Sequence, residues 1–159
     1  MSNKWASLLA FVLPLGLIAG ALISEYGFGL FPCEMCMWQR WPHYAAIVLG
    51  GLALVLNRSV MARPLTLLAA LAILISGTIG GFHAGVEYGW WEGITSCASG
   101  FEQGLDAAQT LDAIMDAPIV RCDTAPWSVF GISLAGFNFL FSVFGAIIIF
   151  MMARSSKGA

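Results

Sequence analysis

Charged residues are scarce in this sequence. They make up 10% of its 159 residues, whereas hydrophobic residues make up 59%. Soluble domains carry about a quarter charged residues, so this composition argues against a soluble domain and predicts an integral membrane protein. The seven basic residues form no cluster and the net charge is −2, which gives no reason to expect a nucleic-acid partner.

Residues that bind metals are also few. The chain has two histidines, His43 and His83, and four cysteines, Cys33, Cys36, Cys97 and Cys122. Only one Cys-x-x-Cys is present, and without a second such pair a zinc site is disfavoured. A c-type haem motif would need histidine where Met37 stands, so we expect no metal site. No Gly-rich dinucleotide fingerprint or flavin-type segment is present either.

What the sequence does contain is four long apolar segments. A helix rises ~1.5 Å per residue, so about 20 residues cross the core of a bilayer. We predict an all-α integral membrane protein, a four-helix transmembrane bundle that forms a single domain over residues 1–159. The predicted spans are residues 5–23, 41–56, 65–86 and 129–153, and the loops at one end are residues 24–40 and 87–128.

Prolines and small residues mark features within these spans. The first span could instead be a signal peptide, because the small residues 19–21 resemble a cleavage site, although the apolar run continues past them. Pro42 suits the first turn of the second helix, where its missing N–H does no harm. In the third span Gly77, Gly81 and Gly85 recur every four residues, which would let another helix approach closely.

The longer loop, residues 87–128, carries seven of the nine acidic residues. Within it, apolar residues recur at helical spacing and aspartates lie mostly opposite them. The apolar set is Leu105, Ala108, Leu111, Ile114 and Met115, and the aspartates are Asp106, Asp112 and Asp116. We expect a short amphipathic helix over residues 105–116, either on the membrane surface or packed on the end of the bundle.

The basic residues fix the predicted orientation. With four spans, the side that holds both termini and the turn at residues 57–64 carries five basic residues and no acid: Lys4, Arg58, Arg63, Arg154 and Lys157. The positive-inside rule therefore puts the termini in the cytoplasm. All four cysteines then lie on or near the outer, oxidising face, where disulfides persist.

The four cysteines allow three pairings, and structural disulfides are one reading of them. A bridge between Cys97 and Cys122 would close a loop large enough to gain about 3–4 kcal/mol. A bridge between Cys33 and Cys36 would close so short a loop that it adds little stability and strains the bond. Strained, exposed disulfides are the reactive ones, so this pair is better suited to redox chemistry.

Redox catalysis requires a cysteine thiolate with a lowered pKa. A Cys-x-x-Cys at a helix N-terminus beside a cation meets that requirement. Cys36, Arg40 and His43 stand at i, i+4 and i+7, so they share one face if the helix begins by Cys36. Arg40 could otherwise simply reach toward the headgroups.

His83 lies near the outer end of the third span, with Glu87 one turn on. It is either a contact for a cofactor or a hydrogen-bonded packing residue. A channel or small-molecule carrier is a further alternative, but the spans lack the charged residues that usually mark such a path. Because no dinucleotide motif is present, a lipid-soluble quinone entering from the bilayer is the electron acceptor that we expect.

The motif Cys33-x-x-Cys36-x-x-x-Arg40 in the first outer loop, the wide cysteine pair in the second and the four spans resemble the disulfide bond formation protein B (DsbB) family. The similarity runs over essentially the whole chain. Relatives of vitamin K epoxide reductase place their loop cysteines before the Cys-x-x-Cys. The reversed order here favours the DsbB family.

This resemblance implies a thiol:quinone oxidoreductase of the bacterial inner membrane that reoxidises a periplasmic, DsbA-like thiol oxidase of the thioredoxin fold. By match to the family, Cys97 would form the mixed disulfide with that partner, and Cys122 would exchange with Cys33. Cys36 would pass the electrons to ubiquinone or menaquinone, with Arg40 stabilising its thiolate. His83 and His43 are further candidates for quinone contacts, although the family assigns His43 no role. The alternative is a tetraspan protein whose outer-loop disulfides are purely structural.

Overall fold

A computed structural model describes residues 3–94 and 120–155 of the chain. These residues form four α-helices, one short π-helix and one β-hairpin. In chain order they are α1 (Asn3–Leu22), η1 (Ile23–Gly27), α2 (Glu34–Val55), α3 (Ala62–Glu87), β1 (Ser128–Val129), β2 (Ile132–Ser133) and α5 (Leu134–Ser155). Cys97 and the amphipathic helix predicted at 105–116 lie outside the described residues.

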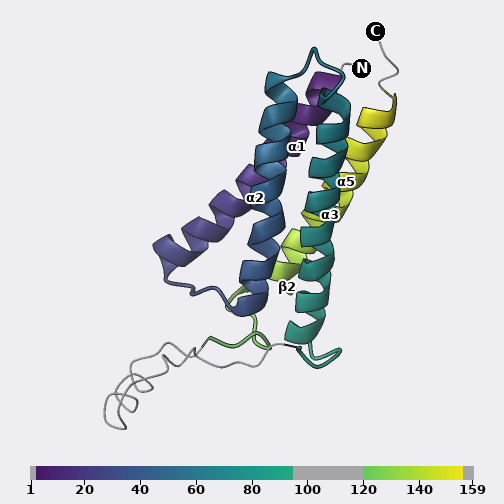
Figure 1. Ribbon diagram of the computed structural model, residues 1–159. Helices are drawn as coiled ribbons and strands as arrows, with labels where there is room; N and C mark the ends of the chain where they lie inside the picture. Colours follow the sequence, from purple (N-terminus) through teal and green to yellow (C-terminus); the bar gives the residue numbers. More distant parts are fainter. Residues whose placement is uncertain (1–2, 95–119, 156–159) are drawn as a thin grey trace, which may run out of the picture.

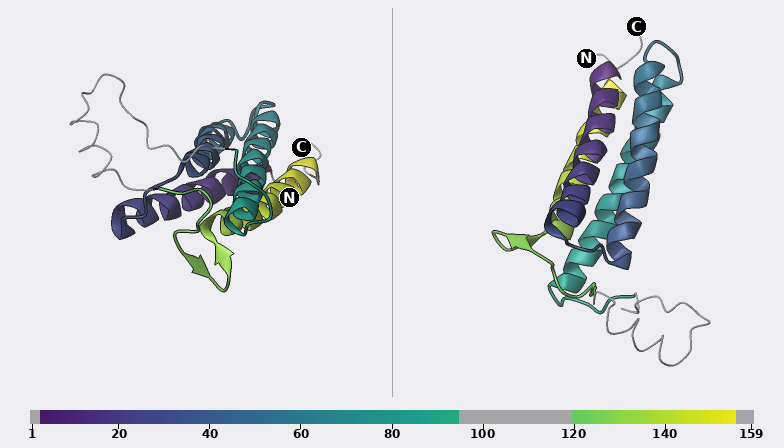
Figure 2. Two further views of the ribbon diagram at one scale, coloured as in Figure 1. Left: turned by 90° about the horizontal axis from the view of Figure 1, so that it is seen from below. Right: turned by 90° about the vertical axis from the view of Figure 1, so that its left-hand side faces the viewer.

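The helices run alternately up and down (Figure 1). α3 packs against α2 and α5, and α1 packs against the same two helices. The beginning of α1, the turn between α2 and α3, and the end of α5 lie at one end of the molecule. Toward the opposite end α1 diverges from α2 and α3, as two views agree (Figures 1 and 2). The Cys-x-x-Cys lies at this splayed end, at the start of α2.

Three of the described helices are long and apolar enough to cross a membrane. They cover Lys4–Gly27, Ala62–Glu87 and Leu134–Ser155. The mostly helical, multi-span character predicted from composition is therefore confirmed. α2 is not among these candidates, so the predicted span at residues 41–56 stays a prediction.

Two helices begin elsewhere than the sequence led us to expect. α2 begins at Glu34 and not near Trp41, so the expectation that Pro42 occupies its first turn is wrong. The helix starts early because Cys33 caps it: the sulfur accepts a hydrogen bond from the backbone N–H of Cys36. Because Pro42 then lies inside the helix, its ring removes one backbone hydrogen bond without ending α2.

The span predicted from Val129 becomes helical only at Leu134. The residues before it form the β1–β2 hairpin, whose turn places Phe130 at φ 53° and Gly131 at φ 78°. Two successive positive φ angles are the mark of a tight hairpin turn. The hydroxyl of Tyr88, at the end of α3, donates to the carbonyl of Gly131 at 3.1 Å and so holds the hairpin against the bundle.

Small residues determine how closely the helices pack. A Cβ at Gly77 would lie 2.9 Å from the Cβ of Ser142, and one at Gly81 would lie 2.8 Å from the ring of Phe139. Both positions thus allow α5 to approach α3, as the four-residue spacing predicted. Gly85 instead faces the ring of Trp91, in the segment after α3.

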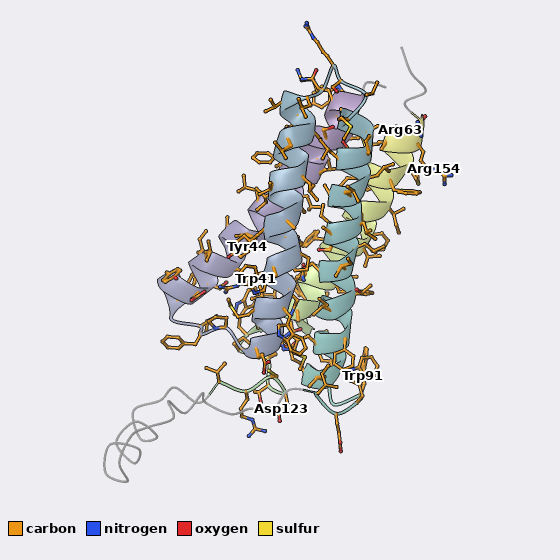
Figure 3. The ribbon with its side chains drawn as sticks, viewed as in Figure 1. Trp41, Tyr44, Arg63, Trp91, Asp123 and Arg154 are labelled. Atoms are coloured by element: carbon orange, nitrogen blue, oxygen red, sulfur yellow. The ribbon has the colours of Figure 1, made fainter. Side chains whose placement is uncertain are left out.

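The buried core divides into two clusters. The half nearer the α2–α3 turn is mostly alanine: Ala10, Ala46, Ala69, Ala70, Ile73, Ala146 and Ile149. The cluster at the splayed end consists of Cys33, Met35, Val86 and Cys122. Arg63 and Arg154 lie at the first of these ends, and Trp91 and Asp123 at the second (Figure 3).

Candidate redox site

The site begins at the N-terminus of α2. Pro32 precedes Cys33, whose extended backbone (φ −75°, ψ 172°) leads into the helix as its N-cap. The backbone N–H of Cys36 donates to the sulfur of Cys33 at 3.2 Å, and the thiol of Cys33 donates to the sulfur of Cys36 at 2.8 Å. Both sulfur atoms therefore lie within reach of each other at the positive end of a helix dipole.

The two cysteines differ in acidity, and both precede the predicted span at 41–56. The hydrogen bond that Cys33 donates to Cys36, together with burial, raises the pKa of Cys33 to about 12. Acceptance of that same hydrogen bond lowers the pKa of Cys36 below its ordinary value. The proton is thus favoured on Cys33, and Cys36 is the more acidic cysteine of the pair.

Cys122 belongs to the same cluster, although it is far away in sequence. It is buried beside Cys33, Met35 and Val86, and its backbone interacts with the ring of His83. Three of the four cysteines predicted to be catalytic are therefore brought together, while Cys97 lies outside the described residues.

Arg40 lies one turn after Cys36 and is buried. Its guanidinium donates to the carboxylate of Glu25, with 2.5 Å between the nitrogen and the oxygen. Glu25 comes from η1, a π-helical turn of the kind often found at functional sites. A buried arginine held in an ion pair does not match the alternative in which Arg40 only reaches toward the headgroups.

His83 lies beside the cysteine pair on α3. Its Nε2 is 3.5 Å from the sulfur of Cys33 and 3.8 Å from a carboxylate oxygen of Glu87. Its other ring nitrogen, Nδ1, is 2.8 Å from the side-chain nitrogen of Gln39. The ring is therefore part of the redox site, and it is also hydrogen-bonded and buried, so the two readings of His83 are compatible.

Two amides that the sequence analysis did not single out extend this network across the bundle. Asn138 on α5 donates to the side-chain oxygen of Gln39 at 2.8 Å, and its own oxygen is 2.9 Å from Nε2 of His43. An amide inside a phenylalanine-rich span, as at Asn138, is the signal that could have found it, because buried polar groups in spans are costly and usually have a role.

Two cavities meet at the side chains of Cys36, His83 and Glu87. The inner cavity, about 400 Å³, lies between the second half of α1 and the first half of α5 and is lined mostly by apolar groups, with Cys36, Arg40, His43 and His83 among its polar lining residues. The outer cavity, about 320 Å³, is lined by both cysteines of the pair and, from the segment around Cys122, by Val120, Arg121, Thr124 and Pro126. Cys36 lines both cavities, whereas Cys33 lines only the outer one.

A Cys-x-x-Cys at a helix N-terminus, a buried Arg40 and a second cysteine segment packed on the pair are features expected of the family that the sequence resembles. The family described as Disulfide bond formation protein DsbB matches residues 3–152. The chain belongs to the DsbB family. It is therefore a disulfide bond formation protein of a membrane-bound family.

Two relatives named Disulfide bond formation protein B agree with this assignment. Disulfide bond formation protein B of Verminephrobacter eiseniae is 28% identical over 90% of this chain and 82% of its own length. The protein of the same name from Haemophilus influenzae is 30% identical over 80% of this chain and 72% of its own. An uncharacterized protein of Rickettsia prowazekii is 27% identical over 79% of this chain and 73% of its own. No solved structure matches the chain.

A metal ion is the main rival explanation for such a site in a DsbB-family chain. The ligand atoms of Cys33, Cys36 and His83 lie within 4.8 Å of one another. A histidine that binds metal through Nε2 must carry its proton on Nδ1 and donate it to an acceptor. Here Nδ1 faces the donating amide nitrogen of Gln39, which also donates to the carbonyl of Met35. The donor set suits a hydrogen-bonding histidine and not a metal ligand.

Proposed function

We propose that this protein is a thiol:quinone oxidoreductase that reoxidises a DsbA-like, thioredoxin-fold disulfide donor and passes the electrons to a membrane quinone. It acts as a multi-pass protein of the bacterial inner membrane, with its termini in the cytoplasm and its cysteine loops in the periplasm. The quinone is ubiquinone or menaquinone. Family membership supports the disulfide-forming half of this proposal, and the two cavities support the electron acceptor.

The observation that carries the proposal is the position of Cys36 between the two cavities. The outer cavity lies against the segment that contains Cys122, where exchange between disulfides takes place. The inner cavity opens between α1 and α5, the direction from which a lipid-soluble molecule arrives. A thiolate that lines both can receive electrons on one side and release them on the other.

The relay consists of two exchanges. The reduced partner attacks the disulfide between Cys97 and Cys122, so the partner is oxidised and this pair becomes a dithiol. The thiolate of Cys122 then attacks the Cys33–Cys36 disulfide at Cys33, and Cys36 leaves as a thiolate. Attack by Cys97 on the mixed disulfide restores the bridge between Cys97 and Cys122 and releases Cys33 as a thiol. The contact of Cys122 with Cys33, and not with the inner cavity, supports this order.

Each turnover then reoxidises the pair of α2. The thiol of Cys33 and the thiolate of Cys36 become one disulfide, which releases two electrons and one proton. A quinone bound in the inner cavity would accept these and one further proton from solvent to become a hydroquinone. Cys36 presents its sulfur to the inner cavity, while Cys33 gives up its proton and forms the sulfur–sulfur bond. His83 donates to the sulfur of Cys33 and so stabilises it as its proton leaves.

The inner cavity fits a quinone headgroup. Its volume of about 400 Å³ is that of a small-molecule site, and apolar groups make up most of its wall. Two buried side-chain atoms among the described residues lack a hydrogen-bond partner, Nδ1 of His43 and Oε2 of Glu87, and both residues line this cavity. Such orphan atoms call for a polar ligand. Arg40 adds a cation that would hold a ring oxygen of the quinone, and His43 would accept a hydrogen bond from a hydroxyl group of the reduced ring.

The positions of the charges support the proposed orientation. Arg63 and Arg154 lie at the end of the bundle opposite the cysteines (Figure 3). Cytoplasmic ends of membrane proteins are enriched in Lys and Arg, so the cysteine end faces the periplasm.

An anaerobic assay tests the function directly. Purified protein is mixed with a reduced thioredoxin-fold thiol oxidase and a soluble quinone, and quinone reduction is followed by absorbance. We expect reduction that requires Cys33, Cys36, Cys97 and Cys122, and that the exposed-amide control Asn57→Ser leaves intact. Full activity of Cys36→Ser would overturn its assignment. The structural-disulfide alternative requires that Cys33→Ser lowers stability while no quinone is consumed by the wild-type protein.

A further inference from the structure

Two amides form the link between the histidines, and backbone carbonyls determine how the first is oriented. The carbonyl of Met35 can only accept a hydrogen bond, so the group 3.1 Å from it must be the amide nitrogen of Gln39. The same nitrogen is 2.8 Å from Nδ1 of His83, which must therefore accept. In the neutral ring the proton of His83 is then on Nε2, the atom that faces Cys33 and Glu87.

The second amide, Asn138, is oriented in the same way. Its nitrogen is 2.8 Å from the side-chain oxygen of Gln39 and 3.3 Å from the carbonyl of Ser76, and both are acceptors. Its oxygen therefore faces His43, where Nε2 donates to it at 2.9 Å, and it also accepts from the hydroxyl of Ser142 at 2.8 Å. The neutral ring of His43 then has a bare lone pair on Nδ1.

Rotating either amide by half a turn would be costly. A rotated Gln39 would set its oxygen against the carbonyl of Met35, and a rotated Asn138 would set its oxygen against the carbonyl of Ser76. Two facing acceptors repel each other and leave the rotated amide oxygen without a donor at that position, and an unsatisfied buried polar group costs about 1–3 kcal/mol. The orientations of the two amides are thus locked by the main chain of α2 and α3.

The helices also leave room for this pair. A Cβ at Gly80 would lie 3.0 Å from the amide nitrogen of Asn138 and 3.1 Å from the side-chain oxygen of Gln39. Any larger residue at this position would press on the hydrogen bond that joins the two amides. The site is therefore built around the pair.

We propose that Gln39 and Asn138 are positioning residues that fix both histidines as Nε2–H tautomers. His83 then donates toward the sulfur of Cys33, and His43 offers Nδ1 as a hydrogen-bond acceptor to the ligand of the inner cavity. An acceptor at this position recognises a hydroxyl group, so the site holds the hydroquinone product more tightly than the quinone. The preference for the product rests on the proposed function, whereas the tautomers do not.

Histidine labelled with ¹⁵N in the full-length, detergent-solubilised protein tests the tautomers by NMR. In the wild type we expect both neutral rings to carry the proton on Nε2. Gln39→Glu replaces the donor to Nδ1 of His83 with an acceptor, so the proton of His83 should move to Nδ1 while His43 keeps its tautomer. A proton on Nδ1 of His83 in the wild type, or an unchanged ring in Gln39→Glu, would overturn the proposal.

Two variants of Asn138 test whether its side-chain oxygen fixes the tautomer of His43. Asn138→Leu removes the acceptor that holds His43, so its neutral ring should become a mixture of tautomers, whereas Asn138→Asp keeps an acceptor and should retain Nε2–H. Asn57, which donates to the carbonyl of Leu54 in the exposed α2–α3 turn, supplies the control Asn57→Asp with both rings unchanged. Loss of the Nε2–H form of His43 in Asn138→Asp but not in Asn138→Leu would contradict the assignment.

Product inhibition tests the role of His43 in the working enzyme. One hydrogen bond changes affinity by about threefold to tenfold, so His43→Leu, which removes the acceptor, should raise the inhibition constant of the hydroquinone by that factor. The KM for the reduced protein partner should stay unchanged. An unaltered inhibition constant would overturn the ligand contact. If the wild-type protein reduces no quinone but the tautomers are as described, the proposed function fails and the positioning role stands.

Discussion

The thiol of Cys33 donates a hydrogen bond to the sulfur of Cys36, with 2.8 Å between the two sulfurs. This single contact makes the two cysteines chemically different, because it holds the proton on one and favours the thiolate on the other. Cys33 also lines only the outer cavity, whereas Cys36 lines both. The difference in acidity thus follows the division of labour that we propose.

Removing Cys33 should therefore make Cys36 less acidic. Its pKa is lowered mainly by the hydrogen bond from Cys33, so in Cys33→Ala the pKa rises and less thiolate is present at neutral pH. The pH dependence of alkylation of Cys36 by iodoacetamide measures this pKa. It is compared between two proteins that lack Cys97 and Cys122, one with Cys33 and one with Cys33→Ala. We expect the midpoint to move to higher pH and the rate at pH 7 to fall.

The reciprocal variant supplies the control. In Cys36→Ala the largest cause that raises the pKa of Cys33 is gone, so the alkylation midpoint of Cys33 should fall below about 12. A midpoint of Cys36 that stays fixed or moves down when Cys33 is removed would refute the shared-proton arrangement.

The ion pair between Arg40 and Glu25 leads to a second prediction. Glu25→Gln leaves a buried guanidinium without its counter-charge, and breaking a buried pair costs about 3–5 kcal/mol. The pair is not fully buried, so we expect the lower part of that range, measured as a shift in thermal unfolding. The exposed Glu34, in the first turn of α2, supplies the control Glu34→Gln with little effect.

Arg40→Ala should raise the apparent KM for quinone and leave the KM for the thiol partner unchanged. If Glu25→Gln proves as stable as the control, the ion pair has no structural role. If the quinone KM of Arg40→Ala equals that of the wild type, the cavity does not use the cation.

Much of this site could be predicted from local pattern. The spacing of Cys36, Arg40 and His43 places all three on one face of a helix, and all three line the inner cavity; this needs only helical geometry. The apolar length of the spans likewise gave the helical architecture. The start of α2 could not be predicted, because it depends on a sulfur of Cys33 that replaces the usual oxygen of an N-cap residue.

The polar network was not predictable for a different reason. Gln39 and His83 are 44 positions apart, and Asn138 and Gln39 are 99 apart, so their contacts exist only once α2, α3 and α5 pack. The absence of Cβ at Gly80 is equally a matter of tertiary packing. A sequence pattern marks which residues are polar, but not which of them meet.

Gly80→Ala should consequently disturb the amide pair. The added methyl would lie 3.0 Å from the nitrogen of Asn138, closer than most real contacts, and overpacking a core costs about 1–3 kcal/mol. Gly51, where a Cβ would lie 3.5 Å from the Phe11 ring, supplies the control Gly51→Ala, which should be neutral or slightly stabilising because alanine favours a helix. Equal thermal stabilities of the two variants would show that the space at Gly80 is not needed.

The last prediction concerns metal binding by the reduced protein. Cys33, Cys36 and His83 lie close enough to hold an ion, but the amide nitrogen of Gln39 faces the ring nitrogen that would have to donate. Gln39→Glu supplies a carboxylate there, which creates the carboxylate–histidine arrangement typical of metal sites. Such partners change metal affinity by about 10–100-fold, so Gln39→Glu should bind Zn²⁺ more tightly than the wild type by that order. Competition with a chromogenic chelator, under anaerobic conditions and with Asn57→Asp as the control for added charge, measures the difference. Wild-type affinity equal to that of Gln39→Glu would mean that His83 can already present Nε2 to a metal, and the orientation that we assign to Gln39 would then be wrong.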